Sequence, residues 1–269
     1  MSAIADAHTD VQEPVVLRRT DGAVATLTLN RPTAYNALSI GLMEAVLEEL
    51  AALDRDPSVA VVVIEGSGRG FCAGHDLKEV QANPDTAFRE RTFKTCSALM
   101  LGIARLRQPV IAKVHGIATA AGCQLVATCD LAIAADTARF GTPGVNIGLF
   151  CSTPMVALSR AVHRKQAMEM LLTGELISAS KAVDTGLINR AVPAGDLDRE
   201  TKGLADLIAS KSHKVLKTGK EAFHRQIDMT LEDAYAYAGG VMVDNLGYAD
   251  SKEGIAAFID KRPPIWKHE

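Results

Sequence analysis

The alternation of apolar and polar residues predicts how the chain begins. Residues 14–32, PVVLRRTDGAVATLTLNRP, are typical of a β-hairpin, because apolar and β-branched residues flank the favoured turn pair Asp21-Gly22. The near-continuous apolar run 59–66, VAVVVIEG, predicts a strand buried on both faces, and such strands belong to parallel sheets. Another strand is predicted over 131–135.

Apolar residues at helical spacing predict the helices that separate these strands. Residues 39–56 form one such segment, in which Ser39 can cap the N-terminus. Its apolar stripe consists of Leu42, Val46, Leu50 and Leu53. A longer helix is predicted over 86–107, and another begins at the small residues before Gln124. Strand, glycine-rich loop, helix and strand thus repeat, which indicates an α/β fold.

The domain organisation follows from a change in pattern after residues 173–178, where the chain becomes mostly helical and more charged. We expect a mobile N-terminus over 1–13, an α/β core over 14–204 and a C-terminal helical region over 205–269. The helical region can pack on its own core or on a neighbouring subunit, and the pattern leaves both arrangements open.

Composition narrows the class of protein. The 269 residues carry a net charge of −3 that is spread along the chain, which argues against a nucleic-acid partner. The five cysteines are odd in number and have no metal-ligand spacing, so they are interpreted as small buried apolar residues in a reducing, cytoplasmic compartment. The N-terminus resembles no targeting signal, and no apolar run reaches the roughly 20 residues of a membrane span.

Two small-residue turns are the candidates for chemistry. In FCAGHDL, Gly74 permits a tight bend that leaves a backbone N–H uncovered, and Asp76 can cap the following helical turn. In TAAGC, residues 120–122 open a helix in the same way. Two such N–H groups can converge on one oxygen and form an oxyanion hole, in which each donor contributes about 3 kcal/mol to a transition state. Either turn alone is a weak signal.

Together and in this order, the turns and their surroundings strongly resemble the enoyl-CoA hydratase/isomerase (crotonase) superfamily. The motifs that carry the resemblance are LNRPTAYNALS (29–39), FCAGHDLKEV (71–80), the segment from HGIATAAGCQL to GVNIGL (115–149), LLTGELISASKAVDTGLINRAVP (171–193) and FIDKRPPIW (258–266). The resemblance implies a spiral of ββα repeats and a C-terminal helical region that builds trimers, usually paired into hexamers. It also implies an acyl-CoA thioester as substrate or ligand, with no further cofactor and no metal.

By motif position, the resemblance assigns residues to this ligand. The backbone N–H groups of His75 and Ala121 correspond to the oxyanion hole. The residues that correspond to contacts with coenzyme A are Ala34, Ala73, His75, Asp76, Leu77 and Lys78. Lys261 and Arg262 resemble basic residues near a CoA phosphate, although a solvated terminus explains them equally well.

The acids of the family's hydration reaction are missing from the corresponding positions. Hydratases of this family use two glutamates to activate water and deliver a proton. The positions correspond here to Gln124 and Gly144, and a third acid position of some members falls near Ser152. An amide cannot act as a base near neutral pH, and glycine offers only backbone. We therefore expect weak or absent hydration, with thioester binding intact.

Three functions remain open on the sequence. The first is an acyl-CoA lyase or isomerase in which His75 replaces the glutamates, although a histidine that covers the CoA adenine or a surface loop fits the same position. The second is a non-catalytic acyl-CoA-binding protein. The third is a CoA thioester hydrolase with Cys151 or Ser152 as nucleophile, although this pair can equally line the acyl pocket.

Overall fold

The structure, a computed structural model, describes residues 13–269, so the predicted mobile segment 1–13 lies outside it except for Glu13. The predicted hairpin is present as β1 (Val16–Asp21) and β2 (Val24–Leu29), which pair antiparallel. Gly22 has φ +57 in the turn, a conformation that a residue without Cβ adopts at no steric cost.

Six strands form the main sheet, in the order β1-β2-β3-β4-β6-β9. After the hairpin every pair in it is parallel. The four further strands are β3 (Val61–Gly66), β4 (Val110–Val114), β6 (Leu131–Ala135) and β9 (Arg190–Val192). A smaller sheet has the order β5-β7-β8 and consists of β5 (Ile117–Thr119), β7 (Arg139–Gly141) and β8 (Ile177–Ser178).

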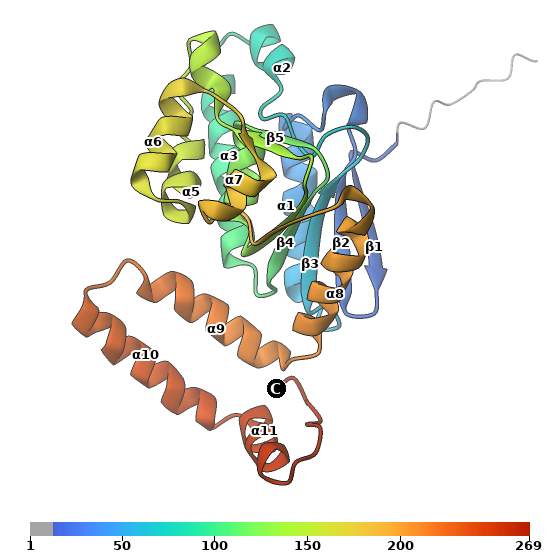
Figure 1. Cartoon of the computed structure of the whole chain (residues 1–269), viewed down its shortest axis with the longest axis vertical. Coiled ribbons are helices and arrows are strands. Elements are labelled where there is room, and N and C mark those ends of the chain that lie inside the picture. The colour runs from blue at the N-terminus through green and yellow to red at the C-terminus, as the bar shows by residue number, and fades with distance from the viewer. Residues whose placement is uncertain (1–12) are drawn as a thin grey trace, which may run out of the picture.

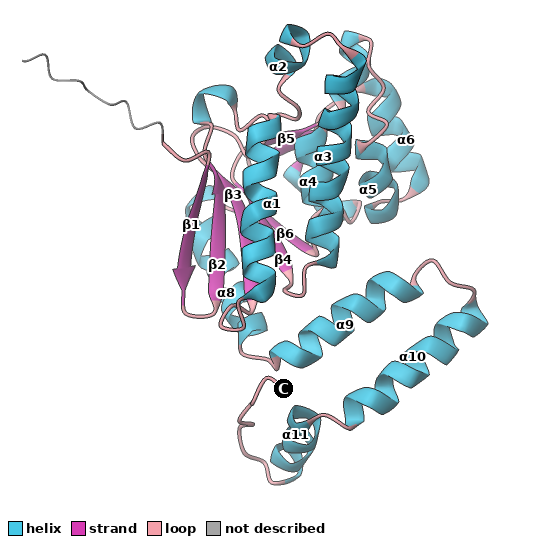
Figure 2. Cartoon of the chain, turned by 180° about the vertical axis from the view of Figure 1, so that it is seen from behind, coloured by secondary structure: helices cyan, strands magenta, loops and turns pink. Residues whose placement is uncertain are grey.

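The buried strand β3 has apolar residues on both faces, as its sequence predicts. Val62 and Ile64 belong to the main core, which lies against α1 (Ile40–Arg55) and α3 (Thr86–Arg105). Val61 and Val63 point to the opposite face, where α8 (Leu197–Ala209) packs. The sheet is thus covered on both sides (Figures 1 and 2). Ser39 caps α1 as predicted, since its hydroxyl accepts from the Leu42 N–H.

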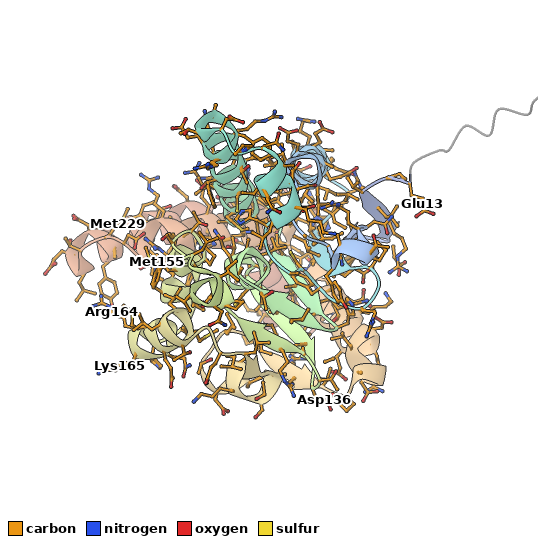
Figure 3. The ribbon with its side chains drawn as sticks, turned by 90° about the horizontal axis from the view of Figure 1, so that it is seen from above. Glu13, Asp136, Met155, Arg164, Lys165 and Met229 are labelled. Atoms are coloured by element: carbon orange, nitrogen blue, oxygen red, sulfur yellow. The ribbon has the colours of Figure 1, made fainter. Side chains whose placement is uncertain are left out.

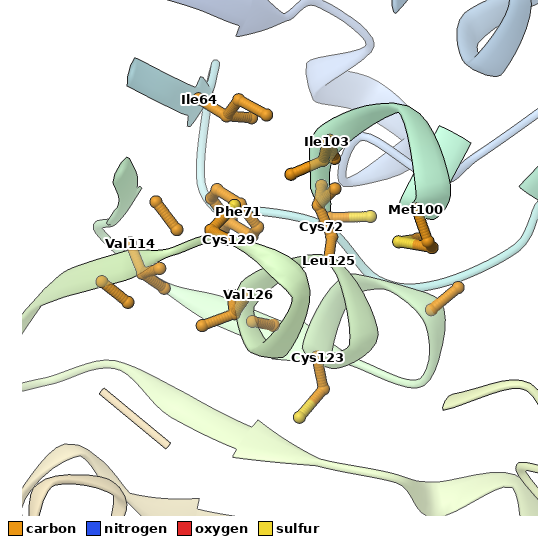
Figure 4. Packing of buried hydrophobic residues seen from close by; sticks show 14 of the residues in the cluster. Ile64, Phe71, Cys72, Met100, Ile103, Val114, Cys123, Leu125, Val126 and Cys129 are labelled. Atoms are coloured by element: carbon orange, nitrogen blue, oxygen red, sulfur yellow. The ribbon is translucent and has the colours of Figure 1, made fainter. Parts of the chain in front are cut away.

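Helix α4 (Ala121–Thr128) packs among buried cysteines and aliphatic residues (Figure 4), and four further helices complete the core. They are α2 (Leu77–Ala82), α5 (Pro154–Ala161), α6 (Arg164–Thr173) and α7 (Ala179–Asp184), with 3₁₀ turns η1 (Pro32–Ala34), η2 (Pro143–Ile147) and η3 (Ala194–Asp196). All five cysteines are buried and free, as interpreted from the sequence.

Three helices leave the core and form a C-terminal arm (Figure 1). They are α9 (His213–Gln226), α10 (Leu231–Leu246) and α11 (Ala249–Ile259). The expected division at residue 205 falls inside α8, whose Ala205 packs against β3, so the arm begins at His213 instead. The turn that carries Met229 projects beyond the core when the molecule is seen from above (Figure 3). In the described part, no helix is long and apolar enough to cross a membrane.

A buried lysine fastens the arm to the core. The Lys220 ammonium on α9 donates to the carbonyl oxygens of Ile103 (3.0 Å) and Gln108 (2.9 Å) and to the Asp130 carboxylate (2.6 Å). These three acceptors use all three of its protons. The side chain is only 7% exposed, so the pair is held away from water and each partner depends on the other.

The last residues of the chain fold back onto the start of α9. The Asp250 carboxylate accepts hydrogen bonds from the backbone N–H groups of Lys267 (2.6 Å) and His268 (2.9 Å). The rings of His213 and His268 are stacked with centroids 3.8 Å apart. The backbone N–H of His213 donates to Nδ1 of His268 (3.2 Å). The tail is therefore held against the start of α9.

Candidate active site

The two small-residue turns predicted to carry chemistry pack directly against each other. Gly74 has φ +102, and a Cβ placed on it would lie 2.9 Å from Cβ of Ala120 and 3.4 Å from the backbone nitrogen of Ala121. A Cβ on Gly122 would overlap the carbonyl oxygen of Cys72. The backbones meet this closely because both positions lack side chains.

The turn before α4 presents an uncovered N–H at this contact. Ala120 adopts φ 50 and ψ −118, a strained conformation for a residue with a Cβ. It is held by the Ala120 N–H to the Gly141 carbonyl (2.9 Å) and by the Gln124 N–H to the Ala120 carbonyl (3.0 Å). Ala121 is the first residue of α4, so its N–H has no acceptor within the helix.

The His75 N–H is uncovered as well. Leu38 bridges the residues on either side, since its N–H donates to the Gly74 carbonyl (2.7 Å) and its carbonyl accepts from the Asp76 N–H (3.1 Å). This pattern leaves the His75 N–H directed away from Leu38. Across residues 13–269, neither this group nor the Ala121 N–H has a hydrogen-bond acceptor. Two free donors thus lie on adjoining turns, next to a helix N-terminus that favours negative charge.

The His75 imidazole faces the interior rather than a surface loop. Its Nε2 is buried without a partner among the described residues, and its ring meets Phe93 edge-on at 5.2 Å between centroids. Burial lowers the pKa of His75 to about 4. The ring is therefore neutral near pH 7 and is a much weaker base than an exposed histidine.

Gln124 lies one helical turn after Ala121, inside the protein. It is 5% exposed, and its Oε1 is 3.9 Å from the Cys96 thiol of α3. Its Nε2 donates to no group of residues 13–269 (Figure 4 shows the neighbouring core). This amide can hold an oxygen of a ligand, but it cannot move a proton as a carboxylate does.

Gly144 lacks an acidic side chain, and its turn also has no room for any side chain. A Cβ there would lie 2.5 Å from the Leu149 carbonyl oxygen and 2.8 Å from Sγ of Cys151. The turn is closed by the Leu149 N–H, which donates to the Gly144 carbonyl (2.9 Å). A glutamate at this position would require the backbone of the turn to move.

The candidate nucleophiles lack an activating base in the described chain. The Ser152 hydroxyl is exposed and donates to the Phe150 carbonyl oxygen (3.3 Å). Burial raises the pKa of the Cys151 thiol, which keeps it protonated at neutral pH. Neither side chain is hydrogen-bonded to a histidine in residues 13–269, so the arrangement does not favour nucleophilic attack on a thioester.

The residues assigned to coenzyme A lie on one surface beside the two turns. The Ala73 N–H donates to the Tyr35 carbonyl (3.0 Å), which joins its segment to the turn that contains Ala34. The side chains of Ala73, Leu77 and Lys78 are exposed. Ala73 and His75 flank Gly74, so this segment adjoins the donor pair along the chain.

Asp76 is a structural residue in this chain. Its carboxylate caps α2 as predicted, accepting from the backbone N–H groups of Lys78 (3.1 Å) and Glu79 (3.2 Å), and it pairs with Arg31 (2.7 Å). Burial raises the pKa of this carboxyl, but the hydrogen bonds from Arg31 and the helix N–H groups outweigh burial and leave it below its usual value. Asp76 therefore holds the loop in place.

Lys261 is not beside these residues within one chain. It follows α11, at the end of the molecule opposite α2 (Figure 1). Its neighbour Arg262 forms a two-pronged ion pair with Glu253 (2.6 and 3.0 Å) on its own arm. Either residue could meet a coenzyme A bound to these turns only if the arm of one subunit reached the site of another.

Sequence reasoning missed three residues that shape the site. Asn36 is fully buried, and its Nδ2 donates to the carbonyl oxygens of three residues in the loop that leads to Gly74: Ser67, Gly70 and Phe71. The asparagine itself was a possible signal, because it is one of the few residue types that tolerate the positive φ of 55 found at this position. Phe93 and Cys96, the α3 residues that contact His75 and Gln124, have no local signal in the sequence.

The fold and site define a class of protein: a parallel-sheet α/β protein in which two small-residue turns present adjoining backbone donors. A family model described as enoyl-CoA hydratase/isomerase matches residues 19–269, and the chain belongs to this family. The enoyl-CoA hydratase domain-containing protein 3, mitochondrial, of Xenopus laevis is 46% identical over 255 residues, which cover 95% of this chain and 87% of that protein.

Two solved structures have the same fold. The crystal structure of an enoyl-CoA hydratase of Mycobacterium smegmatis is similar with a TM-score of 0.93 and 51% identity, covering 94% of this chain and 99% of that one. The human enoyl-CoA hydratase domain-containing protein 3 is similar with a TM-score of 0.92 and 43% identity, covering 94% of this chain and 100% of that one. The crotonase-like fold expected from the sequence is thereby confirmed.

Proposed function

We propose that this chain binds acyl-CoA thioesters, with the thioester oxygen held between the N–H groups of His75 and Ala121. The observation that carries the proposal is the packing of Gly74 against the Ala121 nitrogen, which brings two donors without acceptors onto adjoining turns. Such fixed donors stabilise negative charge on a carbonyl oxygen and cost no reorganisation when it forms.

The coenzyme A part of the ligand then lies across the exposed residues Ala73, Leu77 and Lys78 and the half-buried Ala34. Lys78 is the charged member of this group and can approach a phosphate. Lys261 completes the phosphate contacts from the arm of a second subunit. The arm supports this assembly, because α9 and α10 bury little apart from the Lys220 side chain and expose apolar side chains such as Tyr235 (75%) and Val243 (70%). A homotrimer, or two trimers paired into a hexamer, covers these faces.

Hydration of an enoyl thioester is weak in this proposal. The position of one family acid holds the amide of Gln124, and that of the other holds Gly144 in a turn without space for a side chain. Losing one positioned acid or base typically lowers a rate by about 10²–10⁴. His75 does not compensate, because its pKa of about 4 leaves it a poor base.

Loss of the enoyl-thioester absorbance tests this proposal, with a short and a long trans-2-enoyl-CoA as substrates. We expect the wild type to turn over at least about 10²-fold more slowly than an enzyme with both acids. Gln124→Glu restores one acid without moving backbone and raises the rate, whereas the matched change Gln166→Glu on α6 does not. Calorimetric titration with butanoyl-CoA reports binding separately.

The two results divide the possibilities. Binding without turnover favours an acyl-CoA-binding protein that has an oxyanion hole and no hydratase activity. Hydration by the wild type at ordinary enzymatic rates contradicts the role given to Gln124 and Gly144. Failure of butanoyl-CoA to bind contradicts the thioester site itself. Release of free CoA, detected with a thiol reagent, would instead indicate hydrolysis, and Cys151→Ala and Ser152→Ala would then identify the nucleophile.

A further inference from the structure

A single arginine links the turn before α1 to the loop that carries His75. The Arg31 guanidinium donates from Nη1 to the Ala37 carbonyl oxygen (2.5 Å) and from Nη2 to the Asp76 carboxylate (2.7 Å). Ala37 immediately precedes Leu38, and Asp76 immediately follows His75. One planar group therefore holds together the two chain segments that pair at Leu38 and His75.

The direction of the His75 N–H depends on this pairing. In a trans peptide, the carbonyl of one residue and the N–H of the next point in opposite directions. The Gly74 carbonyl is turned toward Leu38, whose N–H donates to it at 2.7 Å. The His75 N–H in the same peptide therefore points away from Leu38, where it is free to meet a ligand.

The pairing is short, and it follows a permissive residue. Leu38 and His75 form an isolated bridge rather than part of a longer ladder. The bridge consists of the bond to the Gly74 carbonyl and of a second bond from the Asp76 N–H to the Leu38 carbonyl (3.1 Å). Gly74 has φ +102 and no Cβ, so its own sterics allow the peptide before His75 to rotate. Rotation requires the bridge to open, and a contact that keeps Asp76 beside Ala37 opposes this.

Arg31 is fixed at its backbone as well as at its guanidinium. Its N–H donates to Oδ1 of Asn36 (2.9 Å), the fully buried residue whose amide holds the loop before Gly74. The side chain of Arg31 is 25% exposed and that of Asp76 is 13% exposed. An ion pair that still meets water adds little to the free energy of unfolding, but a planar guanidinium with two acceptors fixes their relative orientation. The pair is therefore suited to set geometry rather than stability.

We propose that Arg31 is a positioning residue for thioester binding: by joining Asp76 to Ala37, it holds the His75 N–H in the direction in which it meets the thioester oxygen. The proposal rests on the proposed thioester site and adds a residue that acts through its neighbours. Loss of Arg31 leaves the other donor in place, since the Ala121 N–H belongs to the start of α4. It also leaves α2 capped, because the cap uses Oδ1 of Asp76 and the ion pair uses Oδ2.

Calorimetric titration with two ligands isolates the donors: butanoyl-CoA, and S-butyl-CoA, a thioether of the same length that lacks the carbonyl oxygen. The ratio of the two affinities reports the hydrogen bonds to that oxygen, because the contacts of the coenzyme A part cancel. We expect the wild type to bind the thioester about tenfold more tightly than the thioether. In Arg31→Met this preference should fall to about threefold or less, while S-butyl-CoA binds within about twofold of its wild-type affinity.

Two further variants complete the experiment. Asp76→Asn keeps an oxygen that can cap α2 and removes the charge that pairs with Arg31, so the thioester preference should fall as in Arg31→Met, and the double variant should lose no more. The matched control Arg18→Met loses an ion pair with Asp56 of similar exposure on β1 and should keep the wild-type preference. Thermal unfolding shows that each variant is folded; if Arg31→Met is not, Asp76→Asn decides the outcome.

The outcomes separate this proposal from the proposed function. Equal affinities of the wild type for the two ligands contradict the donor pair, and the role of Arg31 falls with it. A wild-type thioester preference that persists in Arg31→Met and Asp76→Asn overturns the role of Arg31 and leaves the thioester site standing. Equal weakening of both ligands also overturns it, because Arg31 then contacts coenzyme A or supports the whole loop. A lost preference in Arg18→Met overturns it too, since any missing ion pair then has the same effect.

Discussion

Because the two turns approach each other closely, a single added methyl group should lower the free energy of unfolding most strongly at Gly122. A Cβ at this residue would overlap the Cys72 carbonyl oxygen and lie 2.7 Å from its carbonyl carbon and 2.9 Å from its Cβ. The atoms in the way are mainly backbone, and the same carbonyl oxygen accepts from the Thr119 N–H (3.0 Å), so relief of the overlap breaks that bond. Overpacking costs about 1–3 kcal/mol, and a rigid neighbour places Gly122→Ala at the upper end.

Thermal unfolding of Gly122→Ala at a fixed protein concentration measures this cost. A loss of about 3 kcal/mol in the free energy of unfolding corresponds to a fall in Tm of about 6–12 °C for a chain of this size. The displaced turn should also weaken butanoyl-CoA binding at least about tenfold. The matched control is Gly203→Ala, in the exposed middle of α8 with no atom within 4 Å, which should be neutral or stabilise by up to about 1 kcal/mol. If Gly122→Ala melts like the wild type, the turns are not in contact and the proposed donor pair is not formed.

Three further predictions concern charge. Lys220→Met should cost about 3–5 kcal/mol of unfolding free energy, because the part-buried Asp130 carboxylate loses its ammonium partner and keeps only the Val110 N–H and the longer contact with His224; a loss under 1 kcal/mol would show that the arm is held by other contacts. The pKa of His75 is lowered to about 4 from 6.5, so only the unfolded chain gains this proton between those pH values. The free energy of unfolding should therefore fall as the pH drops through this window. The urea midpoints at pH 7 and pH 5 should differ less for His75→Gln than for the wild type; if the two proteins show the same difference, the His75 imidazole is exposed to water. Since the Asp250 carboxylate holds the tail through the backbone N–H groups of Lys267 and His268, Asp250→Ala should release the tail and shift the emission of Trp266, the single tryptophan, to longer wavelength; an unchanged spectrum refutes this.

The sequence predicted the elements whose signals are local. The Asp21-Gly22 hairpin, the Ser39 cap and the apolar strand, predicted over 59–66 and found over 61–66, are all present, because turn chemistry, capping and two-sided burial each depend on a few consecutive residues. The predicted boundary near 205 falls inside α8, because the packing that decides it involves residues far apart in the sequence. One side of α8 is apolar, and only the folded sheet shows that Ala205 packs against it.

The site could be predicted in its backbone and not in its side chains. The turns at 74 and 120–122 carry glycine and alanine, whose small size is visible in the sequence. The contacts of His75 with Phe93 and of Gln124 with Cys96 depend on how α3 crosses the core, and no local pattern records that. The crowding at Gly144 is likewise invisible, because the atoms that cause it belong to residues 149 and 151.

That crowding also limits which proteins this sequence can become. A lineage that carries this chain can reach an acid at position 124 through one amino-acid replacement, because a glutamine and a glutamate occupy the same volume. It cannot reach one at position 144 in the same way, since any replacement first meets the Leu149 carbonyl oxygen at 2.5 Å. The backbone of residues 144–151 would have to change its path first. A single amino-acid replacement at position 144 therefore does not produce a hydratase with both acids.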